Sequence, residues 1–343
     1  MKRKRSFMTI LLVVSLVLSL GLVGCSSSTD QSSEQPAVKK HIFKLSNVFT
    51  ADQPLNITLN EVADNIKERT NGSIEFQIYP NGEIANSQDG VEQVVRGADF
   101  ILVDSPSNMG PWVPDYEALI GPMLYDTREE YSQMCQSDLV KELNLKAEEA
   151  GIKVLALDYT FGFRSLAGQE AIKNPEEFAG KKWRVPKSQL WIDTLTAMGA
   201  QPITTAWSEV YSAVQEGVVA GFETSVSDMY DNHMEEIIKN VSLTKHFLGT
   251  TGVMISKTVW DSLTDEEQQI MQEEFTAGAI RNNERIDVIE DEARKAMEAA
   301  GVEFTEVDTQ AFRDATKVVF DNSKFTPGFY DEMQDELAII RSK

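Results

Sequence analysis

One arginine is placed where an anion could bind. Arg184 lies in AGKKWRVPKSQLW, residues 179–191, and its neighbours Trp183 and Val185 form a pattern typical of a short buried strand that ends at Pro186. A guanidinium group stays charged when it is desolvated, and its rigid fork of N–H donors matches a carboxylate. Such an arginine can hold an anionic ligand, or it can pair with an acid across a domain edge.

Residues that commonly carry catalysis or bind metals are sparse. None of the three histidines, His41, His233 and His246, has the spacing of a metal site. The chain has no GxSxG, P-loop, GxGxxG or CxxC motif. Its 54 acidic residues are explained by a solvated surface, although spacing alone does not exclude a glycosidase-type pair. An enzyme is not favoured, and no metal or cofactor is expected.

The elements that must position Arg184 alternate between strand and helix. Strand patterns at 41–48, 73–80, 99–104 and 152–158 are separated by helix patterns at 59–70, 90–97 and 128–150. The second half repeats the rhythm, with helices near 188–198 and 208–215. This alternation predicts an α/β fold with mainly parallel sheets.

A long helix is predicted at 264–301. Thr264 and Glu267 form a capping box at its start, and apolar residues follow at helical spacing. A helix of about 35 residues is roughly 50 Å long. We expect it to span two domains.

Composition limits the partners. The chain has 343 residues, 42% of them apolar and 25% charged, which is enough for two ordinary domains. Its formal charge of −22 repels phosphate backbones and anionic lipid. Nucleic-acid binding is therefore not expected, and an anionic ligand needs a pocket in which local arginines outweigh the surrounding field.

The N-terminus predicts export. MKRKRSFMTILLVVSLVLSLGLVGC has a basic start and an apolar run, and it ends in LVGC, which resembles a lipobox with Cys25 as the lipidated residue. Removal of residues 1–24 would bring the charge to −26. The alternative is an uncleaved anchor helix, but the run is short for a span. Residues 26–40 are typical of a flexible tether. We expect an extracytoplasmic protein, lipid-anchored to the cell membrane.

With Cys25 used by the lipid, Cys135 has no partner for an intramolecular disulfide. It lies in EEYSQMCQSDLVKEL, an amphipathic helix pattern. A small core residue is therefore favoured over a catalytic thiol.

Residues 178–224 resemble a motif of the TRAP-transporter solute-binding proteins, the DctP family. They contain R-V-P, then G-A-Q-P, then E-V-Y-S-A-V-Q-E-G-V-V-A-G-F-E in the family's order. The segments SIEFQIYPNGEI and ALIGPMLY also resemble the family, and the resemblance covers roughly residues 41–340. It implies a periplasmic-binding-protein-like fold, type II-like, with two hinged domains and a long helix that spans both.

The implied domains are residues 41–161 with 250–289, and 162–249 with 290–343. The implied role is to capture an organic acid and deliver it to the TRAP permease membrane subunits, without catalysis.

The resemblance assigns the ligand clamp to Arg184. In the family, this arginine forms a two-pronged salt bridge with the ligand carboxylate. Arg164 matches a supporting cation, with a surface or hinge residue as the alternative, and Trp207 matches an aromatic that packs on the ligand, with core packing as the alternative. Asp104 ends a strand, where α/β sheets bind ligands, and is expected to accept hydrogen bonds from ligand hydroxyl or amino groups.

The remaining implied binding residues close the motif or match polar cleft positions more loosely. They are Glu223, Thr224, Ser87, Asn47 and Lys187.

The ligand expected from this set is a sugar acid, either a uronate or an aldonate, because Asp104 suits hydroxyl groups. The alternatives are a C4-dicarboxylate, a keto acid, or a ligand-sensing role on the same fold. The motif departs from the family at Ala220, which replaces an aspartate, and at Thr224-Ser225, which replace Asn-Pro. These departures leave the clamp intact and concern the rest of the ligand.

Overall fold

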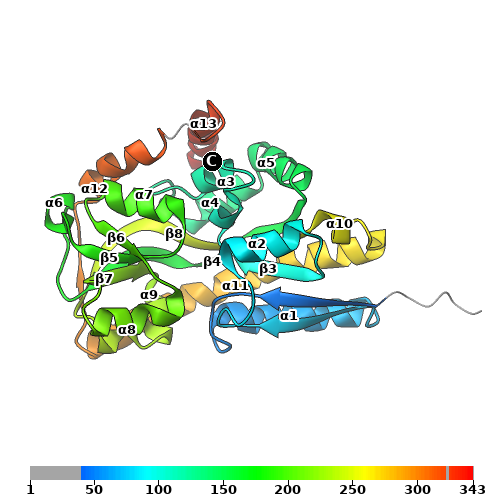
Figure 1. Ribbon diagram of the computed structural model, residues 1–343, viewed down its shortest axis with the longest axis horizontal. Coiled ribbons are helices and arrows are strands. Elements are labelled where there is room, and N and C mark those ends of the chain that lie inside the picture. The colour runs from blue at the N-terminus through cyan, green and yellow to red at the C-terminus, as the bar shows by residue number, and fades with distance from the viewer. Residues whose placement is uncertain (1–39, 322–323, 343) are drawn as a thin grey trace, which may run out of the picture. The chain divides into compact units, whose positions relative to one another are not determined.

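The computed structural model describes residues 40–321 and 324–342, and the strands in these residues form one sheet with the order β2-β1-β3-β8-β4-β7-β5-β6, with β9 paired to β8 (Figure 1). The strands are β1 (His41–Ser46), β2 (Ile74–Tyr79), β3 (Phe100–Asp104), β4 (Ile152–Gly168), β5 (Lys182–Val185), β6 (Gln201–Thr204), β7 (Gly221–Thr224), β8 (Asn240–Ser256) and β9 (Glu303–Thr305).

The sheet is mixed. β1 pairs in parallel with β2 and β3, and β5 pairs in parallel with β6 and β7. In the middle, β8 runs antiparallel to β3 and β4, and β4 runs antiparallel to β7. The predicted α/β class is confirmed. The expectation of mainly parallel pairing fits the two ends of the sheet, and β4 and β8 make the centre antiparallel.

Helices cover both faces of the sheet. They are α1 (Pro54–Arg69), α2 (Ser87–Val95), α3 (Asp115–Leu119), α4 (Arg128–Cys135), α5 (Asp138–Glu149), α6 (Pro175–Phe178), α7 (Gln189–Ala197), α8 (Val210–Gln215), α9 (Val226–Asp231), α10 (Lys257–Trp260), α11 (Asp265–Ala299), α12 (Thr309–Thr316) and α13 (Phe329–Arg341). Short 3-10 turns lie at η1 (Pro106–Met109), η2 (Trp207–Glu209), η3 (Met234–Glu236) and η4 (Lys317–Val319).

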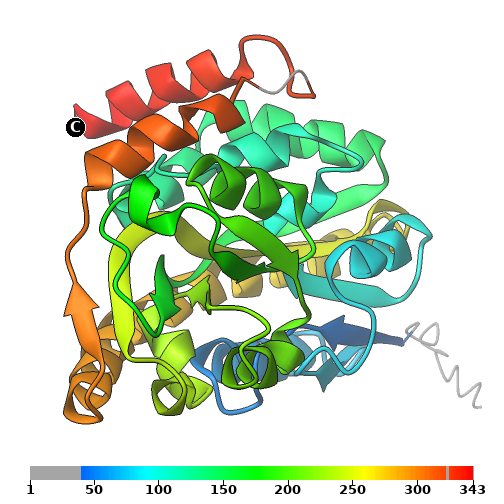
Figure 2. The ribbon, with the colours of Figure 1, turned by 60° about the vertical axis from the view of Figure 1, so that its left-hand side comes forward.

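Alternating residues of the strands divide the apolar core between the two faces. Leu102 of β3 packs in a core with α2 to α5, α7, α12 and α13, whereas Ile101 and Val103 pack with α1 and the first half of α11. A third cluster joins β7, α8 and α9 to the end of α11. Figures 1 and 2 show α12 and α13, in orange to red, on the side of α4 and α7.

The predicted long helix is present as α11, with 35 residues. Thr264 accepts from the backbone N–H of Glu267, and the Glu267 side chain accepts from the backbone N–H of Thr264, so the predicted capping box is confirmed. Phe275 lies in one apolar cluster and Met297 in another. One helix therefore supports two cores.

Other helices differ from the sequence expectation in length. The helix expected over 128–150 is divided into α4 and α5, because Ser137 caps a new helix by accepting from the backbone N–H of Val140. Cys135 ends α4 and packs against the core, as expected. None of the helices in residues 40–321 and 324–342 has the length and apolar character that a membrane crossing requires. The predicted export signal, Cys25 and the tether up to residue 39 lie outside the described residues.

Candidate ligand-binding site

A cavity of about 730 Å³ lies where the parallel strands end. Residues that follow the carboxyl ends of β1, β2 and β3 line it, at 48–50, 81–89 and 104–108. Residues at or after the ends of β5, β6 and β7 also line it, at 184–191, 204–209 and 224–228. Open α/β sheets bind ligands at this edge, because loops and helix N-termini converge there.

Seven of the nine sequence-predicted binding residues line this cavity. They are Ser87, Asp104, Arg164, Arg184, Lys187, Trp207 and Thr224. Glu223 and Asn47 do not line it, although both are fully buried.

Arg184 is a buried cation without an acidic partner in the described residues. Its side chain is on β5, and the residue is only 4% exposed. Nε donates to the carbonyl oxygen of Thr205 at 2.9 Å, and the guanidinium lies over the Trp207 ring at 5.3 Å. Burial lowers the pKa of Arg184 to about 10, so it is charged at neutral pH. Its terminal nitrogens donate no hydrogen bond to the part of the chain that the structure describes.

Arg164 has a different environment. Nε and one terminal nitrogen each donate to a carboxylate oxygen of Glu223 at 2.6 Å, and the same terminal nitrogen donates to the Glu223 carbonyl at 2.9 Å. The β4–β7 register brings the two residues together by pairing Leu166 with Glu223. Arg164 also lies over the rings of Phe161 and Trp191.

Glu223 is held as a carboxylate. Burial by itself raises the pKa of Glu223, but the Arg164 ion pair and His246 outweigh it and hold the pKa at about 2. His246 Nε2 lies 3.5 Å from the Glu223 carboxylate, and burial lowers the pKa of His246. Glu223 therefore neutralises Arg164, whereas Arg184 forms no ion pair in the described residues and interacts with Glu223 and Asp228 only at longer range.

Trp207 and Thr224 extend the same wall. Trp207 is half-buried and donates from Nε1 to Asn232 at 3.2 Å. Thr224 is fully buried, and its hydroxyl donates to Asp228 at 2.6 Å. Asp228, which the sequence analysis missed, also accepts from Gln53 at 2.8 Å. Its position one helical turn after Thr224 was the available signal.

Asp104 ends β3, as predicted, and faces the cavity. One carboxylate oxygen accepts the backbone N–H of Ser87 at 2.8 Å, and the other accepts the backbone N–H of Ser105 at 2.7 Å. Burial raises the pKa of Asp104, and these hydrogen bonds oppose the increase. Asp104 thus caps the start of α2, and each oxygen retains a lone pair for a ligand hydroxyl.

Lys187 and Asn47 have contrasting positions. Lys187 is exposed at the cavity, immediately before the start of α7, and makes no hydrogen bond or ion pair within the described residues. Asn47 instead exchanges hydrogen bonds with Asn56, at 2.7 and 3.2 Å, and accepts from the backbone N–H of Phe49. It holds the loop after β1. Its predicted ligand contact stays a prediction.

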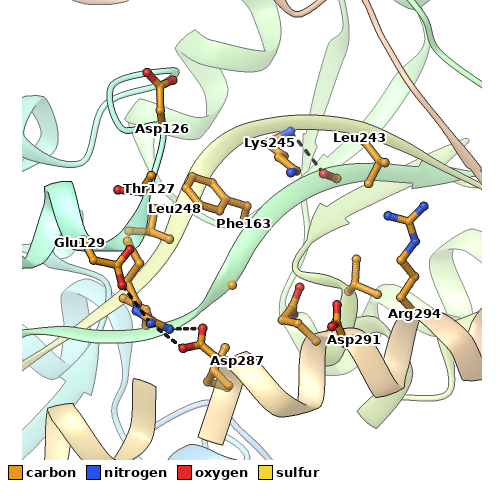
Figure 3. Close-up of a pocket in the computed structure, with 17 residues that line it drawn as sticks. Asp126, Thr127, Glu129, Phe163, Leu243, Lys245, Leu248, Asp287, Asp291 and Arg294 are labelled. Atoms are coloured by element: carbon orange, nitrogen blue, oxygen red, sulfur yellow. Dashed lines mark hydrogen bonds and ion pairs between the residues drawn. The ribbon is translucent and has the colours of Figure 1, made fainter. Parts of the chain in front are cut away.

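A second cavity, of about 510 Å³, contains none of the nine residues (Figure 3). Some of its charged groups are paired with one another. Arg128 forms a two-pronged ion pair with Asp287 and also contacts Glu129. Glu290 accepts the backbone N–H of Ser227 at 2.8 Å. We assign no ligand to this cavity.

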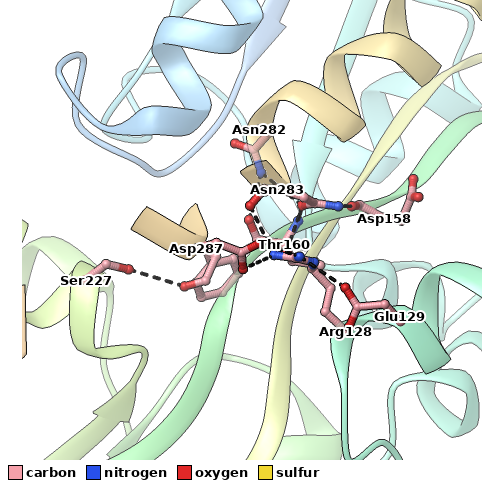
Figure 4. Close-up of polar contacts among 9 residues, drawn as sticks. Arg128, Glu129, Asp158, Thr160, Ser227, Asn282, Asn283 and Asp287 are labelled. Atoms are coloured by element: carbon pink, nitrogen blue, oxygen red, sulfur yellow. Dashed lines mark hydrogen bonds and ion pairs between the residues drawn. The ribbon is translucent and has the colours of Figure 1, made fainter. Parts of the chain in front are cut away.

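Beside it, a polar clasp joins α11 to the middle of β4 (Figure 4). The side-chain oxygen of Asn283 accepts from both the backbone N–H and the hydroxyl of Thr160, at 2.9 and 2.7 Å. Its nitrogen donates to the carbonyl of Asp158, and Asn282 donates to the carbonyl of Thr160. These bonds satisfy β4 backbone groups where its register with β8 is irregular. No group of acidic, cysteine or histidine side chains in residues 40–321 and 324–342 could hold a metal ion.

Comparison with known proteins identifies relatives of this chain. Residues 45–325 match the model of the bacterial extracellular solute-binding proteins, family 7. A relative from Rhodobacter capsulatus, the C4-dicarboxylate-binding periplasmic protein DctP, is 29% identical over 293 residues, which cover 83% of this chain and 86% of the relative.

Solved structures show the same fold. TRAP periplasmic solute-binding proteins from Fusobacterium nucleatum, with bound sn-glycerol-3-phosphate, and from Desulfovibrio salexigens, with diglycerolphosphate, are 43% and 44% identical to this chain. Each has a TM-score of 0.86 and covers 88% of this chain and 98% of its own. A third, from Actinobacillus succinogenes with bound L-galactonate, is 26% identical with a TM-score of 0.82, covering 87% and 99%.

Proposed function

Because this chain belongs to family 7 of the bacterial extracellular solute-binding proteins, which serve transport and are not enzymes, we propose that it captures a small, hydroxyl-bearing organic anion on Arg184 and delivers it to the membrane subunits of a TRAP transporter. One observation carries this proposal. Arg184 is a buried guanidinium in the cavity wall that forms no ion pair with an acid of the described residues. An anionic group would complete that charge and accept from its terminal nitrogens.

Hinge closure is the proposed mechanism. The two groups of residues, 41–161 with 250–289 and 162–249 with 290–343, would move as domains. Two contacts join these groups beside the cavity, since Gln53 donates to Asp228 and the hydroxyls of Ser107 and Ser188 lie 3.5 Å apart, and closure would form contacts of this kind. A ligand that touches both groups would stabilise the closed state.

The ligand class follows from the cations that are free to bind. Arg164 is already paired with Glu223, so a second carboxylate has no second buried arginine to accept it. This disfavours a C4-dicarboxylate or a keto acid whose binding needs two arginines, and favours one anionic group on a hydroxyl-bearing body. Asp104, Asn108 and Gln88 line the cavity and suit hydroxyl groups. A sugar acid satisfies this description, as does a polyol phosphate.

The place of action is proposed to be outside the cytoplasm, at the cell membrane, with Cys25 as the lipid anchor. The export pattern of residues 1–25 supports this. A sensing role on the same fold would use the same cavity. It would differ only in the membrane protein that binds the closed, ligand-bound state.

Isothermal titration tests the proposal. The panel contains a uronate, an aldonate, a dicarboxylate, a keto acid and a polyol phosphate, with neutral sugars as controls. We expect one class of anions to bind and Arg184→Met to weaken it by roughly two to three decades, because loss of one partner of a buried charge pair costs about 3–5 kcal/mol. Arg96→Met, at an exposed arginine outside the cavity, should leave affinity unchanged. Unchanged affinity in Arg184→Met would refute the assignment.

A further inference from the structure

The first turn of α7 opens onto the ligand cavity. β5 ends at Val185, a turn of three residues follows, and α7 begins at Gln189. Pro186, Lys187 and Ser188 of this turn and Trp191 of the first helical turn line the cavity beside Arg184. The site therefore has the strand–turn–helix geometry in which a helix N-terminus directs backbone N–H groups towards a ligand.

These N–H groups lack acceptors. Ser188 precedes α7 with extended backbone, but its side chain does not cap the helix. Within residues 40–321 and 324–342, the backbone N–H groups of Gln189, Leu190 and Trp191 donate to no acceptor. The other long helix that starts at the cavity, α2, differs because the Asp104 carboxylate accepts its first N–H. The start of α2 is thus occupied by the Asp104 carboxylate, whereas the first N–H groups of α7 are available to an anion.

One buried side chain points to a ligand at the same place. Arg184, 96% buried, lines the same cavity as the turn, and its terminal nitrogens have no acceptor in the described residues. Trp191, 5% exposed, also lines the cavity, and its indole N–H is buried without an acceptor in the described residues, so it does not itself open onto the cavity. Lys187 adds an exposed ammonium with no partner in the described chain. These residues line one cavity from one strand, one turn and one helix.

This donor set exceeds the needs of a carboxylate. A carboxylate has two oxygens and one negative charge, which the fork of Arg184 can satisfy alone. A phosphoryl group has three terminal oxygens and close to two negative charges at pH 7. It could accept from Arg184, Lys187 and the amides of α7 together, with the helix dipole favouring its charge.

We infer that the anionic group captured here is the phosphoryl group of a small polyol phosphate, held by Arg184, Lys187 and the first-turn amides of α7. The inference rests on the proposed capture function and specifies its ligand. The structures 43% and 44% identical to this chain contain glycerol phosphates, whereas the 26% identical structure contains a sugar acid. The polyol part then faces the Asp104 side of the cavity.

The test compares sn-glycerol 3-phosphate, glycerate and galactonate by isothermal titration. We expect sn-glycerol 3-phosphate to bind at least roughly tenfold more tightly than glycerate, since each extra charge-assisted hydrogen bond contributes about 1.5–3 kcal/mol. Its affinity should rise between pH 5 and 7, as the second phosphate ionisation near pH 6 is completed. The affinity for galactonate should not change over that range.

Substitution at Ser188 gives the sharpest test of whether the phosphoryl group binds at the start of α7. Asp is a good helix N-cap, so Ser188→Asp should maintain or raise the thermal stability of the ligand-free protein. Its carboxylate would occupy the amides and repel the phosphoryl group, so that affinity for sn-glycerol 3-phosphate falls by about 100-fold or more. Ser188→Asn also caps without charge and should weaken binding by roughly tenfold.

Lysine variants provide a matched pair. Lys187→Met should weaken binding of the phosphate about three- to tenfold at low salt, whereas Lys182→Met, at an exposed position on β5 outside the cavity, should not. Unaltered phosphate affinity in a folded Ser188→Asp protein would overturn the inference. Binding of galactonate without sn-glycerol 3-phosphate would overturn it and leave the capture function standing. If no anion of the titration panel binds, both this inference and the proposed capture function are refuted.

Discussion

The ion pair between Arg164 and Glu223 should make the stability of this protein depend on pH in a defined window. Glu223 is fully buried, and its carboxylate receives two 2.6 Å hydrogen bonds from Arg164. The folded protein holds the pKa of Glu223 at about 2, below its ordinary 4.5, in spite of the opposing effect of burial. A depressed folded pKa stabilises the protein above the unfolded pKa, and this contribution is lost as pH falls towards the folded value.

The size of the effect follows from these two values. A pKa lowered from 4.5 to about 2 corresponds to about 3 kcal/mol of unfolding free energy at pH 7. About 2 kcal/mol of this should be lost between pH 7 and pH 3, because proton binding to unfolded Glu223 then competes with the ion pair. Glu223→Gln removes the titration and leaves Arg164 buried without an acid, at a cost of about 3–5 kcal/mol at pH 7.

Urea denaturation followed by tryptophan fluorescence at pH 7, 5, 4 and 3 measures the difference. The gap in unfolding free energy between wild type and Glu223→Gln should be largest at pH 7 and narrow by about 2 kcal/mol at pH 3. Glu216→Gln, at an exposed carboxylate, should follow wild type throughout. A gap that stays constant from pH 7 to pH 3 would refute the assignment of this pH dependence to Glu223.

Two further substitutions test the region where α11 meets β4. Asn283→Ala should lower the urea unfolding free energy by about 2–3 kcal/mol, because the backbone N–H and hydroxyl of Thr160 lose their shared acceptor; a loss below about 0.5 kcal/mol would show that water replaces it. Gly162→Ala should cost more than Gly180→Ala in the same assay. Both have positive φ, +97° and +71°, but only at Gly162 does a new Cβ meet another residue, at 2.6 Å from Glu290. Equal losses of unfolding free energy in the two variants would show that the contact with Glu290 does not matter.

Local patterns were sufficient to predict the elements at the ends of the sheet. Apolar patterns of ordinary length mark β1, β2, β3 and β5. The capping box of Thr264 and Glu267 predicted the start of α11. The strand-end position of Arg184 left open a ligand contact or an ion pair across a domain edge, and the family resemblance favoured the ligand contact. The structure shows that Arg184 lines a cavity at the carboxyl ends of the parallel strands.

Local sequence patterns did not predict the full extent of the central strands β4 and β8. β8 is buried along nearly all of its 17 residues and carries polar side chains such as Thr244 and His246, so neither alternation nor a simple apolar run marks it. β4 was expected to end at residue 158 and continues to Gly168, through register shifts that disrupt its period of two. Irregular strands of this kind are defined by their partners, which a single sequence does not reveal.

The same limit applies to the roles of the two arginines. Arg164 and Glu223 are 59 positions apart, and only the β4–β7 pairing shows that one neutralises the other. The family resemblance assigned Arg164 a supporting role at the ligand, which stays a prediction, whereas the geometry shows which of its donors are already bonded to Glu223. For Lys187, the sequence offered only a loose match to a polar cleft position. The structure adds that Lys187 lines the cavity next to the start of α7, which has no side-chain cap.

The contrast between surface and cavity explains why the uncompensated cations lie together. The chain carries a formal charge of −22, so an anion approaching from a distance is repelled rather than steered. Exposed charges are screened beyond about 8–10 Å at physiological salt, whereas groups in a desolvated cavity interact more strongly at short range. The anion that we propose as ligand would therefore have to be held by groups that touch it. Glu223 removes the charge of Arg164 from that set, and Asp104 occupies the start of α2. The cations of the cavity wall that form no ion pair in the described residues are Arg184 and Lys187, at the turn to α7, which is where we propose that the anionic group binds.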